Sequence, residues 1–172
     1  MKSILGIGNA LTDILAVLPD DSFLKKYNLP KGSMQFVDME TGNKIFESLK
    51  PYGLHYVAGG SAANTITCTA ILGMPSAFIG KVGEDELGHL FKSDEEQYGV
   101  KTLLLKGKNP SGRSMVLVSG ANAERTFANY MGAALQMVPE DLKPEFLQGY
   151  DYFHIEGSLV QDQDLIRHAV EK

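Results

Sequence analysis

The sequence lacks tryptophan, has one cysteine among 172 residues and has no apolar run of membrane-spanning length. A single cysteine forms neither an intrachain disulfide nor a cysteine-based zinc site, which is typical of a reducing compartment. Acidic residues outnumber basic ones, and the net charge is -5, whereas coating a nucleic acid requires clustered Lys and Arg. We therefore expect a cytoplasmic protein that binds neither nucleic acid nor a membrane.

Two further absences, of metal-ligand spacing and of a nucleophile beside a base, limit the kinds of catalytic site to expect. The four histidines have no metal-ligand spacing, and no nucleophile has a base beside it in the sequence, so we expect no metal site and no nucleophilic centre. Cys68 lies in an apolar stretch, which favours an inert core thiol. Hydrophobic residues make up 44% of the chain, which is enough for one domain with a core.

Short apolar runs alternate with helical patterns along most of the chain. Strands are expected at 3–8, 14–18, 33–38, 54–58, 76–80 and 150–155, and helices at 20–27, 39–50, 61–72, 85–98 and 162–172. This alternation predicts an α/β fold with a parallel sheet, covered by helices and joined by right-handed crossovers. Between 101 and 129, strand-like runs separated by turns indicate a small appendage of β-hairpins.

One glycine-rich motif, 59–64, stands where a strand passes into a helix. Adjacent Gly59 and Gly60 permit positive φ and a close approach of the backbone to a ligand, and the helix N-terminus favours polar or anionic groups. The motif lacks the Gly-Lys-Ser/Thr ending of a Walker loop. It is equally consistent with a tight turn whose small residues allow helix–sheet packing.

Asn9 and Asp13 follow the first strand, at the edge where open α/β sheets bind ligands. A carboxylate and an amide at this edge suit the hydroxyl groups of a polyol. Asp13 is also consistent with a residue that caps a turn. The preceding Gly6-Ile7-Gly8 begins like a dinucleotide-binding fingerprint, but Leu11 occupies the position of the third glycine.

The order and spacing of residues 6–13, 59–64 and 78–88 resemble the ribokinase-like (PfkB) carbohydrate and nucleoside kinases over essentially the whole chain. Within that family, residues 8–17, 23–27, 123–127 and 132–134 look most like adenosine kinases and their bacterial relatives. The resemblance implies a ribokinase-like three-layer α/β fold, with a mostly parallel sheet and a small β-sheet lid. Residues 1–172 would then be the N-terminal portion of a single kinase domain, with lid strands inserted at approximately 13–38 and 101–130.

The resemblance also implies transfer of the γ-phosphoryl group of ATP to a primary hydroxyl of a sugar or purine nucleoside, with Mg²⁺. Asp13 would accept hydrogen bonds from vicinal hydroxyls, and lid closure would exclude water. A homodimer through the lid is a further implication. The residues expected to bind substrate are Asn9, Asp13, Gly59, Gly60, Ser61, Asn64, Phe127, Asn129, Met131 and Glu156.

Two departures from the family pattern bear on substrate and activity. Adenosine kinases place an aromatic residue shortly after the glycine equivalent to Gly157, where this chain has Ser158-Leu159, whereas Glu156 resembles a sugar-binding glutamate of ribokinases. Nucleosides and sugars therefore both stay open. The family's Gly-Ala-Gly-Asp motif, which carries the general base, is absent, so we expect no catalytic residue here. The base and most of the ATP and Mg²⁺ site would lie C-terminal to Lys172, which leaves these 172 residues inactive alone.

Two other functions share parts of this pattern. A Rossmann-type nucleotide-binding oxidoreductase would have the same alternating core and a glycine-rich first turn. A non-catalytic sugar- or nucleoside-binding domain would retain the substrate-binding residues without a base.

Overall fold

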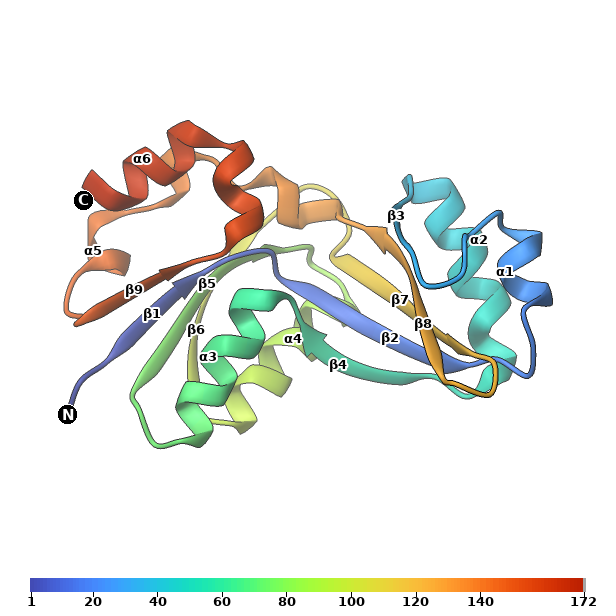
Figure 1. The fold of residues 1–172 in the computed structure, drawn as a ribbon. Coiled ribbons are helices and arrows are strands. Elements are labelled where there is room, and N and C mark those ends of the chain that lie inside the picture. Colours follow the sequence, from blue (N-terminus) through green and yellow to red (C-terminus); the bar gives the residue numbers. More distant parts are fainter. Residues whose placement is uncertain (172) are drawn as a thin grey trace.

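Two β-sheets joined end to end organise the molecule, as Figure 1 shows for the computed structural model, which describes residues 1–171. The strands are β1 (Ile4–Ile7), β2 (Leu11–Val17), β3 (Met34–Phe36), β4 (His55–Gly59), β5 (Ser76–Val82), β6 (Val100–Lys106), β7 (Gly112–Ser119), β8 (Glu124–Tyr130) and β9 (Tyr152–Ile155). The α-helices are α1 (Ser22–Lys26), α2 (Met39–Leu49), α3 (Ser61–Ile71), α4 (Glu86–Gln97), α5 (Pro144–Leu147) and α6 (Gln163–Glu171). Short 3₁₀ helices occupy Lys50–Tyr52, Gly132–Gln136, Pro139–Asp141 and Gly157–Gln161.

The first sheet is parallel, with strand order β6-β5-β1-β9. Helices α3 and α4 cover one face, where Ile66, Phe78 and Phe91 are fully buried. Helix α6 and the segments that contain Met137, Leu142 and Leu159 cover the other face, around Leu5 and Ile79. Because both faces are covered, the two central strands are apolar on both sides, β1 along its length and β5 at Ala77–Ile79, rather than alternating in polarity.

The second sheet is mixed, with strand order β3-β8-β7-β2-β4. Strand β2 runs parallel to β7 and antiparallel to β4, and β7 and β8 form an antiparallel hairpin. One face packs on α1 and α2 through a core that includes Phe23, Ile45, Leu49, Met115 and Leu117. The second sheet therefore has its own hydrophobic core, apart from that of the first sheet.

The structure confirms the α/β fold with a mostly parallel sheet and an additional small sheet, and corrects two expectations about individual strands. Strand β6 does not belong to a hairpin but pairs in parallel with β5, because α4 forms a crossover between them. Strand β4 does not join the parallel sheet but pairs antiparallel to β2. Short apolar strands carry no signal that says which of two sheets they join.

The expectation of a buried thiol was wrong, because Cys68 is exposed. The inward face of α3 is formed by Ala62, Ala63 and Ile66, which are all fully buried. Position 68 falls on the opposite side at about 100° per residue. The prediction was wrong because it relied on the apolar neighbours of Cys68 in the sequence and not on its position around the helix.

Candidate functional site

The junction between the two sheets lies beyond the carboxyl ends of β1 and β9. Asn9 follows β1, is 4% exposed and donates its backbone N–H and its side-chain Nδ2 to the carboxylate of Glu156, at 2.9 and 3.0 Å. Ser158 extends this cluster, because its hydroxyl donates to Glu156 at 2.6 Å and accepts from Asn9 Nδ2 at 3.0 Å. Hydrogen bonds thus join the side chain of Asn9, near the start of the chain, to those of Glu156 and Ser158, near its end.

Asp13 lies on β2 within the second sheet. Gly59 of the neighbouring β4 leaves room for it, since a Cβ atom at Gly59 would lie 2.5 Å from the Asp13 carboxyl carbon. Burial raises the pKa of the Asp13 carboxyl from 3.8 to about 6. Within residues 1–171 this carboxylate has no hydrogen-bond or ion-pair partner that would oppose that rise. A half-buried carboxylate of this kind can accept hydrogen bonds from a ligand.

The strand register places Asp13 in a row of side chains across the second sheet. Asp13 is paired with Ser114 of β7, and Ser114 is paired with Asn129 of β8. The Ser114 hydroxyl donates to Asn129 Oδ1 at 2.7 Å, and both residues are buried. Val57 of β4 and Phe36 of β3 complete the row at its two ends. We call Asp13, Ser114 and Asn129 the polar row.

Apolar residues occupy the next row on the same face. Leu15, Val116 and Phe127 are register partners on β2, β7 and β8, and Met34 of β3 continues the row. These residues alternate with those that pack on α1 and α2, so both rows lie on the face turned away from those helices. A polar row beside an apolar row suits a ligand with hydroxyl groups on one side and carbon atoms on the other.

Gly59 and Gly60, which join β4 to α3, pack against the junction between the two sheets. Gly60 adopts φ 104°, which favours glycine, and a Cβ atom there would collide with the backbone oxygen of Asn9. Ser61 and Asn64, in the first turn of α3, are both exposed. The turn therefore brings the N-terminus of α3 against the loop that joins β1 to β2.

A cavity of about 680 Å³ opens between the second sheet and the two 3₁₀ helices Gly132–Gln136 and Gly157–Gln161. Of the ten expected substrate residues, it is lined by Asn9, Asn129 and Met131. The other seven lie outside this lining: Asp13, Gly59, Gly60, Ser61, Asn64, Phe127 and Glu156. Residues not expected from the sequence also line it, namely Phe36, Val37, Asn109, Tyr130, Gly132, Ala134, Leu135, Gln136, Met137, Ser158, Leu159, Gln161, Asp162 and Leu165. The polar row therefore reaches the cavity at its β8 end.

Sequence reasoning missed Ser114 and the cavity wall at 134–137. Ser114 is followed by the continuous apolar run Met115–Val118, so β7 has no alternation in the sequence that would have identified it. The wall is a single 3₁₀ helix with an irregular continuation, in which no helical or strand period develops. No sequence signal was available for it.

The described residues do not fit a magnesium–nucleotide site by themselves. In residues 1–171 there is no group of three His, Cys, Asp or Glu side chains arranged to hold a metal ion. Of the acids nearest the junction, Glu156 already accepts hydrogen bonds from Asn9, and within that range no other acid lies beside Asp13 to share a metal ion with it.

Residues 1–171 contain no helix long and apolar enough to cross a bilayer.

A parallel α/β sheet with a polar junction at the carboxyl edge of its strands defines an open-sheet α/β protein, the class in which ligands bind at that edge. The chain belongs to the family described as pfkB family carbohydrate kinase, whose model matches residues 33–170. Both the expected family and its ribokinase-like fold are thereby confirmed.

Individual relatives include nucleoside and sugar kinases. Adenosine kinase 2 of Arabidopsis thaliana is 30% identical over 162 residues, which cover 90% of this chain and 46% of that protein. Probable fructokinase-2 of the same plant is 29% identical over 70% of this chain and 37% of that protein. The crystal structure of adenosine kinase from Sinorhizobium meliloti is 33% identical with a TM-score of 0.85, covering 99% of this chain and 52% of that one. The chain thus spans about half or less of the length of these relatives.

Proposed function

We propose that this chain binds the phosphoryl acceptor of an ATP-dependent kinase that acts on a primary hydroxyl of a sugar or purine nucleoside. The observation that carries the proposal is the polar row, in which the unpaired Asp13 carboxylate stands beside Ser114 and Asn129. A carboxylate accepts two vicinal hydroxyl groups, and this fixes a sugar ring and its remaining hydroxyl. Such positioning supplies much of the catalysis in phosphoryl transfer.

In the proposed reaction the acceptor oxygen bonds to the γ-phosphorus of ATP, the bond to the β-phosphate oxygen breaks, and ADP leaves. The acceptor proton passes to a general base. Residues 1–171 contain no group of three His, Cys, Asp or Glu side chains that could hold a magnesium ion, and the family resemblance assigns none of them as the base. We propose that both come from polypeptide beyond Lys172, which is supported by the greater length of the relatives. The second sheet would serve as the lid.

The choice between nucleoside and sugar turns on residues beside the cavity. The similarity to adenosine kinases and the cavity volume of about 680 Å³ support a nucleoside. The similarity to fructokinases and the polar cluster of Glu156 with Ser158 support a sugar. A homodimer through the lid is supported by the exposed Val17, Phe36 and Val57 on the face that carries the polar row.

Calorimetric titration of the chain with adenosine, ribose and fructose tests the proposal. One of the three is expected to bind, and Asp13→Asn is expected to weaken that binding at least a hundredfold. Each lost hydrogen bond to a charged group contributes about 1.5–3 kcal/mol, and about 1.4 kcal/mol corresponds to tenfold. The matched control is Asp164→Asn on the exposed face of α6, which should leave affinity unchanged.

Two results would contradict the assignment. Equal affinity of wild type and Asp13→Asn would remove the proposed role of the polar row. Phosphorylation of the ligand by the 172 residues with ATP and Mg²⁺ would refute the need for further polypeptide. Ligand binding without turnover is expected of this chain, whereas a longer protein with binding but no turnover would support a non-catalytic binding domain.

A further inference from the structure

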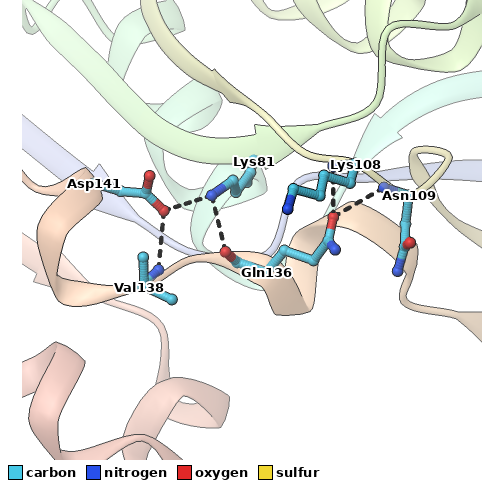
Figure 2. Close-up of polar contacts among 6 residues, drawn as sticks. All are labelled: Lys81, Lys108, Asn109, Gln136, Val138 and Asp141. Atoms are coloured by element: carbon cyan, nitrogen blue, oxygen red, sulfur yellow. Dashed lines mark hydrogen bonds and ion pairs between the residues drawn. The ribbon is translucent and has the colours of Figure 1, made fainter.

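Lys81 lies near the carboxyl end of β5 and is buried, with 8% of its surface exposed. It belongs to the sheet face of Ala77 and Ile79, which is otherwise apolar. Figure 2 shows its ammonium between two acceptors: Nζ donates to the backbone oxygen of Gln136 at 2.9 Å and to Asp141 Oδ2 at 2.6 Å. Lysine is seldom buried without such partners, so the contact is a polar anchor within an apolar surface.

Each acceptor residue accepts further hydrogen bonds, Asp141 from its own turn and Gln136 from a second segment. Asp141 Oδ2 also accepts the backbone N–H of Val138 at 3.0 Å, which closes the short 3₁₀ turn. Gln136 Oε1 accepts the backbone N–H groups of Lys108 and Asn109, at 2.8 and 2.9 Å. Lys81 is thereby linked to two segments that are distant from it in sequence.

Both segments connect the two sheets. Residues 107–111 lead from β6 into β7, and the segment after β8 returns through 131–141 toward β9. They also contact each other, because Ala133 N–H donates to the Pro110 oxygen at 2.9 Å. Asn109, Gln136 and Met137 line the 680 Å³ cavity. The two connections thus form one wall of the cavity and hold both ends of the β7–β8 hairpin.

We propose that Lys81 is a positioning residue that fixes the location of this cavity wall relative to the parallel sheet. The location of Asn129 and the polar row is fixed together with the wall. The two hydrogen bonds of the ammonium have direction, so they fix where Gln136 and Asp141 lie. An apolar side chain of the same length would fill the space without fixing them. The effect on ligand rests on the proposed function, whereas the effect on the wall does not.

Hydrogen exchange followed by mass spectrometry tests the wall directly. Lys81→Met, which keeps most of the stem and removes the ammonium, is expected to raise amide exchange at least tenfold in 107–112 and 131–141. Exchange in 59–71, which touches neither acceptor, should stay within twofold of wild type. The matched control is Lys106→Met at the end of neighbouring β6, where the lysine is 75% exposed and pairs with Glu84. This variant should change neither segment.

Ligand binding separates positioning from general stability. Lys81→Met is expected to weaken the ligand found by calorimetry at least fivefold, and Lys81→Arg, which keeps a cationic donor, should bind within threefold of wild type. Unchanged exchange in both segments, or equal acceleration across the whole chain, would overturn the proposal. So would a Lys81→Met affinity equal to wild type. If wild type binds none of the three ligands, the proposed function fails, and the exchange pattern still decides whether Lys81 sets the wall.

Discussion

Glu95 offers a test of the packing between α3 and α4 that is independent of any ligand. This residue of α4 is 2% exposed, and the Thr67 hydroxyl of α3 lies 2.9 Å from both carboxylate oxygens. Burial, with a smaller contribution from the charge of Asp94, raises the pKa of Glu95 from 4.5 to about 7, although the Thr67 hydrogen bond opposes the rise. The folded protein therefore keeps this carboxyl protonated at pH values where the unfolded chain ionises it.

The sign follows from proton linkage. Between pH 4.5 and about 7 the unfolded state binds fewer protons at this position than the folded state, so the free energy of unfolding falls as pH rises. The contribution of Glu95 is intact below about pH 4.5 and lost above about pH 7. At about 1.4 kcal/mol per pH unit, the whole window corresponds to about 3 kcal/mol.

The perturbation is Glu95→Gln, which removes the ionisation and keeps an acceptor for Thr67. Relative to wild type, the variant should gain about 2 to 3 kcal/mol in free energy of unfolding between pH 4.5 and pH 8. Urea denaturation at several pH values measures the difference, and other titrating groups cancel because both proteins contain them. Glu96→Gln, at an exposed neighbour, is the control and should show no such trend. Parallel stability profiles for wild type and Glu95→Gln would refute the reasoning.

Two further predictions concern the polar row. Because the pKa of Asp13 is raised to about 6, affinity for a hydroxyl-bearing ligand should fall as pH decreases below 6, by up to tenfold per pH unit, and Asp13→Asn should abolish this dependence in calorimetry. Gly59→Ala should weaken binding at least tenfold, because its Cβ atom would lie 2.5 Å from the Asp13 carboxyl carbon, whereas Gly157→Ala meets nothing within 4 Å and should bind normally. A pH-independent affinity, or a Gly59→Ala protein with wild-type binding, would contradict the geometry.

Much of the local structure was predictable from short-range patterns. The expected helix at 39–50 forms as Met39–Leu49, and Asp85 caps α4 by accepting the Gly88 N–H at 2.9 Å. Both follow from period and capping chemistry, which depend on neighbours in the sequence. The hairpin of β7 and β8 also follows from the glycine-containing turn at 120–122.

The candidate site was predictable in part. Asn9 could be nominated because it follows an apolar strand, and Glu156 because it resembles a sugar-binding glutamate of ribokinases, yet their contact with one another joins opposite ends of the chain. The row of Asp13, Ser114 and Asn129 depends on strand register, which is set by two pairings across the second sheet, β2 with β7 and β7 with β8. Periodicity along one strand cannot give the register between strands.

The sequence by itself determined the class of fold, the family resemblance and the glycine turn at 59–60, because these depend on composition, local periodicity and motif order. Only the tertiary structure decided that β4 enters the second sheet while β6 enters the first, and that Cys68 is exposed. It also decided that Lys81 binds one connection between the sheets directly and the other through Gln136. Those outcomes are set by contacts between residues far apart along the chain. Local patterns do not encode which distant partner a buried group will meet.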